Sequence, residues 1–120
     1  MKMISLAGLA ACLALLPVSS ALAAPTYLSC RFADPPNEAQ IFNFMLEPPS
    51  ETLGIHVPET GSQRKVKGEL NAGKLSANEG FVAWEVDPAA LIVIRDKRMV
   101  ARKDRGVCTV ISAAQSGFEP

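Results

Sequence analysis

Turn-forming residues recur about every ten residues between positions 34 and 106 of this chain, with short apolar segments between them. Alternating apolar residues between such turns are typical of β-strands. Many short strands at this spacing favour an all-β fold, a small antiparallel barrel or barrel-like sandwich of about seven or eight strands. Residues 90–94 are apolar at every position, which predicts a strand buried on both faces. We expect strands at residues 27–32, 40–46, 52–57, 64–70, 81–86, 90–94, 98–102 and 107–111.

The first residues have the organisation of a secretory signal peptide. Lys2 supplies the positive charge, residues 4–16 are almost uninterrupted apolar sequence, and Ala21-Leu22-Ala23 fits a cleavage site. We expect cleavage after Ala23, a single β domain over residues 24–120, and a periplasmic or secreted location. A retained transmembrane helix is disfavoured because Pro17 ends the apolar run below the roughly 20 residues that span a bilayer.

A second processing signal lies within this leader. Leu9-Ala10-Ala11-Cys12 fits the lipobox at which bacterial lipoproteins are cut and acylated, which would anchor the protein to a membrane through Cys12. The apolar run before Cys12 is short, and the residues that follow it stay apolar. We therefore favour cleavage after Ala23, with lipid anchoring as the alternative.

Two cysteines remain in the domain once the leader is removed. Cys30 and Cys108 lie near its two ends, and in an exported protein we expect them to form a disulfide. Closing a loop of about 80 residues would stabilise the fold by about 4–5 kcal/mol in the chain-entropy model. The alternatives are two free thiols or half of a metal site. The lack of a Cys-x-x-Cys pair and the single histidine, His56, disfavour metal binding.

The sequence has no signature of catalysis or of a cofactor. It contains no His cluster, no Gly-x-Ser-x-Gly and no Walker or dinucleotide-binding loop, so we predict neither an enzyme nor a cofactor. His56 alternates with Ile55 and Val57, which predicts a solvent-facing histidine, whereas Trp84 is expected to pack in the core. The 12 basic and 12 acidic residues give a balance that suggests neither nucleic acid nor an anionic membrane as partner.

Charge is nevertheless distributed unevenly along the chain. Residues 95–105, the basic ribbon, hold six basic and two acidic residues, whereas residues 34–59 hold five carboxylates and no lysine or arginine. An exposed basic ribbon attracts an oppositely charged partner by long-range electrostatics. The alternative is that it protects an edge strand from aggregation. Its candidate partner-binding residues are Arg95, Arg98, Arg102 and Arg105.

Several segments together resemble a known family. They are Tyr27-x-x-Cys30, the Val82-Ala83-Trp84 strand, and the last third of the chain with Arg95-Asp96-Lys97-Arg98 and the closing Cys108. In these segments, about 40 residues in all, the chain is similar to the membrane-bound and periplasmic inhibitors of c-type lysozyme, which are small exported bacterial β-barrels. The resemblance implies a barrel whose disulfide joins two strands. The family's Ser-Gly-x-x-Tyr loop corresponds to residues 73–80, which contain no tyrosine, so the inhibitory residues are not carried over.

A small disulfide-closed domain without catalytic groups acts by presenting a rigid surface. We therefore expect an exported, non-catalytic binding protein with a protein partner in the cell envelope, inhibitor-like or protective toward an enzyme that attacks the envelope. The expected contact is a loop at residues 73–80, through Ser76, Asn78 and Glu79. The alternative is a structural or accessory envelope protein that contacts peptidoglycan, lipid or a larger assembly through the basic ribbon.

Overall fold

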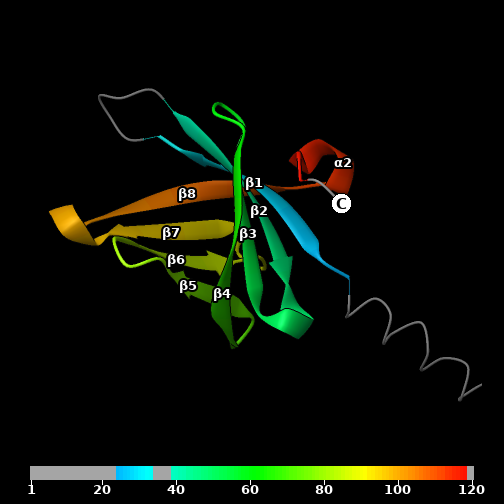
Figure 1. Cartoon of the computed structure of the whole chain (residues 1–120), viewed down its shortest axis with the longest axis horizontal. Helices are drawn as coiled ribbons and strands as arrows, with labels where there is room; N and C mark the ends of the chain where they lie inside the picture. The colour runs from blue at the N-terminus through cyan, green and yellow to red at the C-terminus, as the bar shows by residue number, and fades with distance from the viewer. Residues whose placement is uncertain (1–23, 34–38, 119–120) are drawn as a thin grey trace, which may run out of the picture.

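Eight antiparallel strands close into a barrel in this computed structural model, which confirms the predicted fold class (Figure 1). Each strand pairs with its neighbours in sequence, and β1 also pairs with β8. The structure describes residues 24–33 and 39–118, so the predicted signal peptide and the lipobox at Cys12 lie outside the described residues. The strands are β1 Thr26–Phe32, β2 Gln40–Glu47, β3 Thr52–Val57, β4 Ser62–Asn71, β5 Lys74–Asn78, β6 Val82–Asp87, β7 Ile92–Lys97 and β8 Arg102–Ile111.

The interior of the barrel is filled by the inward side chains of all these strands. Trp84 is 3% exposed, and its ring lies 6.4, 5.5 and 5.4 Å from the rings of Phe32, Phe42 and Phe44. The prediction that Trp84 packs in the core is therefore confirmed. Aromatic contacts of this kind add to the stabilisation from apolar burial. The buried core consists of Leu28, Cys30, Phe32, Phe44, Leu46, Leu53, Ile55, Leu75, Ala77, Trp84, Val86, Val93 and Cys108.

The disulfide lies at the seam where the barrel closes. Cys30 of β1 and Cys108 of β8 are directly opposite each other in the strand pairing, with their Cα atoms 4.0 Å apart. They are bonded to each other, as predicted, and both side chains are buried in the core. The first and last strands are therefore joined by hydrogen bonds and by a covalent link.

Two predicted elements are wrong. The predicted strand at residues 98–102 is not formed, because Arg98–Val100 form a 3-10 turn, η2, and Ala101 adopts a left-handed φ of 52° that turns the chain into β8, which begins at Arg102. Residues 73–80 are not a loop, because Lys74–Asn78 form β5. Leu75 and Ala77 are the buried residues of this short strand. The turns at its two ends leave room for only a brief alternation of apolar and polar residues.

The predicted burial of residues 90–94 on both faces is also wrong. β7 begins at Ile92, and Val93 points into the core, whereas Ile92 and Ile94 are partly exposed on the outer face. A barrel strand has one face toward the interior and one toward solvent, so a continuous apolar run here places two isoleucines on the outer surface.

A short C-terminal segment covers part of the outer surface of the barrel. It contains the helix α2, Ala113–Ser116, and Asn43 Nδ2 of β2 donates a hydrogen bond to the Ser116 carbonyl oxygen at 2.9 Å. The ring of Phe118 lies 5.8 Å from that of His56. His56 therefore faces outward but is partly covered, and the prediction that it is solvent-facing is wrong. Within residues 24–33 and 39–118, no helix is long and apolar enough to cross a membrane.

Candidate binding surface

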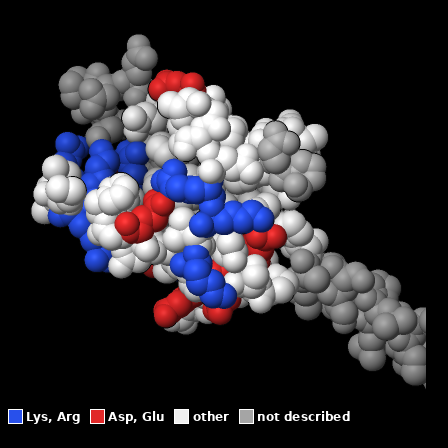
Figure 2. Space-filling model, viewed as in Figure 1, with Lys and Arg blue, Asp and Glu red and all other residues white. Residues whose placement is uncertain are grey.

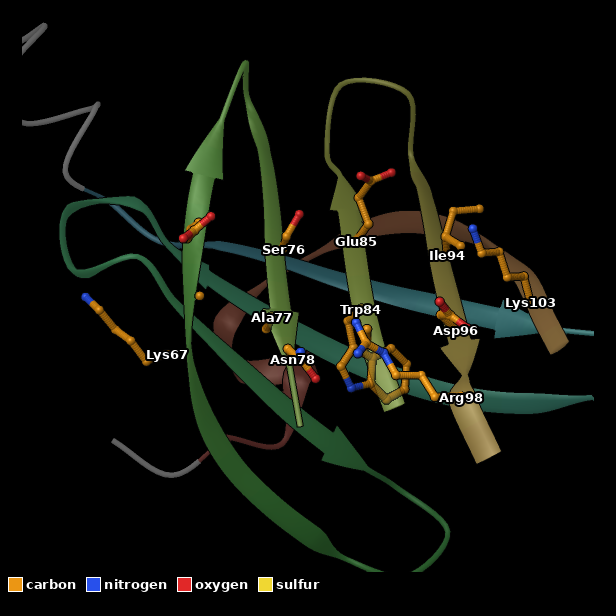
Figure 3. Close-up of a pocket in the computed structure, with 13 residues that line it drawn as sticks. Lys67, Ser76, Ala77, Asn78, Trp84, Glu85, Ile94, Asp96, Arg98 and Lys103 are labelled. Atoms are coloured by element: carbon orange, nitrogen blue, oxygen red, sulfur yellow. The ribbon is translucent and has the colours of Figure 1, made fainter. Parts of the chain in front are cut away.

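A hollow of about 650 Å³ is lined by residues of β4 to β8 (Figure 3). Most of its lining comes from two rows of outward side chains, set by the register of the strands. One row runs Asn78, Ala83, Asp96 and Lys103 across β5 to β8. The next row runs Glu69, Ser76, Glu85 and Ile94 across β4 to β7. The depression arises because the small side chains Ala83 and Ser76 lie in the middle of these rows.

The rim of the hollow carries equal numbers of opposite charges. Lys67, Arg98 and Lys103 are its cations, and Glu69, Glu85 and Asp96 are its anions. Figure 3 shows Ser76, Glu85 and Asp96 on the adjacent strands β5, β6 and β7. A rim of mixed charge discriminates by charge pattern and does not favour a uniformly anionic polymer.

Gly68 allows β4 and β5 to approach each other beside the hollow. It pairs with Ala77 of β5, and a Cβ atom built on Gly68 would lie 2.2 Å from the Ser76 carbonyl oxygen. Only glycine fits such a close backbone approach. The Gly68 N–H donates to the Glu51 carbonyl oxygen at 2.8 Å, which fixes this part of β4. Gly68 was not among the residues predicted to form a site, although an isolated glycine within a strand is a signal of close backbone approach.

Glu79, predicted to contact a partner, is committed to interactions within the protein. It accepts hydrogen bonds from Arg64 Nε at 2.5 Å and Arg64 Nη2 at 2.9 Å, and from Trp84 Nε1 at 2.8 Å. The Arg64 hydrogen bond is the main cause of the lowered pKa of Glu79; burial acts in the opposite direction, and the Trp84 bond lowers the pKa further. Glu79 therefore holds the β5–β6 connection to β4 and to the core tryptophan.

Arg95, also predicted to be an exposed contact, lies inside the barrel. Its side chain is 7% exposed and forms a 2.7 Å ion pair with Asp104, which is equally buried. The Arg95 guanidinium lies 4.3 Å from the centroid of the Phe32 ring and donates to Gln40 Oε1 at 3.1 Å. Lys97 Nζ is a second cation on Asp104, at 2.9 Å. The prediction that the basic ribbon is an exposed surface is therefore wrong for this part.

The pKa of Asp104 reflects a balance between burial and its two cations. Burial is the largest single effect and would raise this pKa, but the hydrogen bonds and charges of Lys97 and Arg95 together outweigh burial and hold the pKa below its ordinary value of 3.8. Asp104 is therefore an anion at neutral pH, as the buried guanidinium requires.

The remaining predicted contacts are divided among different surfaces. Ser76, Asn78 and Arg98 line the hollow. Asn78 also accepts a hydrogen bond from the Gly80 N–H at 2.8 Å, which shapes the β5–β6 turn. Arg102 and Arg105 are both exposed on β8. The structure thus brings together three of the seven predicted partner-binding residues.

Stability is expected to fall as the pH is lowered below about 4.5, the ordinary pKa of glutamate. The pKa values of Glu79 and Asp104 are lower in the folded protein than in the unfolded chain. Their stabilising contribution is therefore complete above the unfolded values and is lost as the pH falls through the folded ones. Urea unfolding midpoints across this range measure the effect. Glu79→Gln should reduce the loss of stability at acid pH. Glu85 is exposed on the outer face, so Glu85→Gln should leave this loss unchanged.

The fold and the hollow define a small closed β-barrel with a partly polar hollow lined by residues of β4 to β8. Comparison with protein-family models, with curated proteins and with solved structures finds no match to this chain. Within the described part of the chain, no three His, Cys, Asp or Glu side chains are grouped as metal ligands would be.

Proposed function

We propose that this protein is a non-catalytic binding protein that receives a segment of a partner protein in the hollow on β4 to β8. The observation that carries the proposal is the hollow itself, in which Ser76 and Ala83 leave space between charged side chains of both signs. A protein segment with side chains of both charges is the ligand that such a rim complements. The volume of the hollow, about 650 Å³, is enough for a few side chains of a partner.

The filled interior of the barrel supports binding on the outer wall. Large aromatic side chains, Trp84 among them, fill the space that would hold a ligand in a carrier barrel. The two most strongly paired carboxylates, Glu79 and Asp104, have lowered pKa values and are held by cations, which does not favour them as proton donors. Both features favour recognition at the surface.

The partner class that we propose is an enzyme that attacks the cell envelope, with this protein acting as its inhibitor or as a protective factor. The disulfide between the first and last strands limits the conformational entropy that the barrel can lose on docking. A rigid surface of this kind keeps more of its contact energy as affinity. This part of the proposal rests on the export that the N-terminal sequence predicts.

The test is an inhibition assay with a panel of lysozymes and other peptidoglycan hydrolases. We expect the protein to slow at least one enzyme at micromolar concentration, and Ala83→Arg to remove this inhibition because the arginine side chain would fill the hollow. Thr109→Arg, on an exposed position of β8 outside the hollow, is the matched control and should inhibit normally. The inhibitor proposal fails if no enzyme is slowed. Equal loss in both variants would mean that the hollow is not the contact surface.

A further inference from the structure

Three large apolar side chains are exposed at the end of the barrel that carries η2. Met99 is 85% exposed, Val100 60% and Phe81 59%. Met99 and Val100 belong to the β7–β8 connection, and Phe81 belongs to the β5–β6 connection. The Arg98 N–H donates to the Phe81 carbonyl oxygen at 3.0 Å, so the two connections are joined. The three side chains are therefore exposed on two joined connections, and we call them the apolar tip.

Cations surround the apolar tip. Arg98 directly precedes Met99, and Arg102 and Lys103 follow closely at the start of β8, all three exposed. Figure 2 shows lysine and arginine side chains gathered around this end of the molecule.

Two of the described carboxylates near this end are paired with cations other than Arg98 and Lys103. Asp104 is inside the barrel with Arg95 and Lys97, and Glu79 is paired with Arg64. Asp96 lies on the outer face of β7 beside Lys103. Among the described residues, the three exposed cations at this end therefore outnumber its partly exposed carboxylate, Asp96.

We propose that the apolar tip docks the protein on an anionic lipid bilayer, with Phe81, Met99 and Val100 entering the interfacial region and the surrounding cations contacting the headgroups. Exposed apolar side chains next to basic ones are the combination that holds peripheral proteins at such surfaces. The tip consists of three side chains, which suits insertion among lipids better than the broad complementary contact of a stable protein interface. A second copy of the chain would bring cations against cations.

This inference goes beyond the proposed function and is independent of it. Phe81, Met99 and Val100 do not line the hollow, so changing them tests lipid docking without altering the proposed contact with a partner protein. Arg98 and Lys103 line the hollow as well, so variants of these two residues are not used to decide between the proposals.

Flotation with lipid vesicles is the first test. The protein is taken in the form that its cells accumulate, with its N-terminus identified by intact mass. We expect it to float with vesicles of phosphatidylglycerol and phosphatidylethanolamine, to do so less at high salt, and to remain unbound with phosphatidylcholine alone. The double variant Phe81→Ser, Met99→Ser should bind at least about tenfold less. The matched control Val107→Ser, Val110→Ser changes two side chains that are each 65% exposed, and should bind normally.

Tryptophan fluorescence is the second test, since Trp84 is the only tryptophan and is buried. Phe81→Trp should show a blue shift of emission with the anionic vesicles, because the indole at the tip leaves water, whereas Val107→Trp should show none. Vesicle binding that persists in the Phe81→Ser, Met99→Ser variant would overturn the proposal. Equal binding to neutral vesicles would overturn it too, as would self-association through the tip without any binding to lipid.

Discussion

Replacing Asp104 with alanine is expected to lower the free energy of unfolding by about 3–5 kcal/mol. The change leaves the Arg95 guanidinium, whose side chain is 7% exposed, inside the barrel without its anion. Lys97 also loses its partner, but its side chain is 32% exposed and can turn toward water. Urea unfolding at neutral pH measures the difference.

Two further variants separate loss of the ion pair from loss of packing. Arg95→Met combined with Asp104→Ala removes both charges and should recover much of the stability, because an apolar side chain can occupy the space beside Phe32. Glu85→Ala removes an exposed outward carboxylate and should change stability by less than about 0.5 kcal/mol. If Asp104→Ala is as stable as the unmodified protein, the buried Arg95 guanidinium does not depend on Asp104 for its stabilisation.

Removing the disulfide is the second change with a large expected effect. The double variant Cys30→Ala, Cys108→Ala should lose about 4–5 kcal/mol in the chain-entropy model, because the bond closes a loop with a sequence separation of 78. The unfolded chain also becomes more expanded, so the dependence of unfolding free energy on denaturant should become steeper.

Denaturant unfolding of the double variant beside the oxidised protein measures both effects. The unmodified protein, fully reduced and alkylated after unfolding, provides an independent comparison without substitutions. Thiol labelling of the native protein should find Cys30 and Cys108 unreactive. Equal midpoints for the oxidised protein and the double variant would contradict the predicted contribution of the bond.

The first strand is predicted closely from the sequence because its inward positions alternate clearly with outward ones. Leu28, Cys30 and Phe32 occupy every second position of β1 and are all buried. β5 was harder to predict, since Leu75 and Ala77 are its only buried residues and turns interrupt the sequence on both sides. Short strands of this kind are indistinguishable from loops when only local pattern is considered.

The burial of Arg95 follows from the phase of its strand, a signal that the charge pattern obscured. Residues two apart on a strand share a face, so the inward position of Val93 also places Arg95 inward. The inward position of Cys108 likewise places Asp104 inward on β8. Counting charges along residues 95–105 treats both faces as one, and for this reason the ribbon was predicted to be exposed as a whole.

The hollow could be predicted only in part because its members come from different strands. Ser76 and Asn78 belong to one segment of the sequence, but Ala83, Asp96 and Lys103 join them through cross-strand register. Register depends on the lengths of several turns, and the turn at residues 98–101 was itself predicted as a strand. The local sequence therefore identifies individual residues of the surface but not the surface itself.

The pairing of the first strand with the last has a consequence for how the chain reaches its folded state. β1 meets β2 early, but its other neighbour, β8, ends at Ile111, close to the end of the described chain. Contacts between such distant segments form slowly, because a long loop must close before they contribute. A growing chain therefore remains open until β8 has been made, and a product that stops after β7 lacks the strand that closes the barrel.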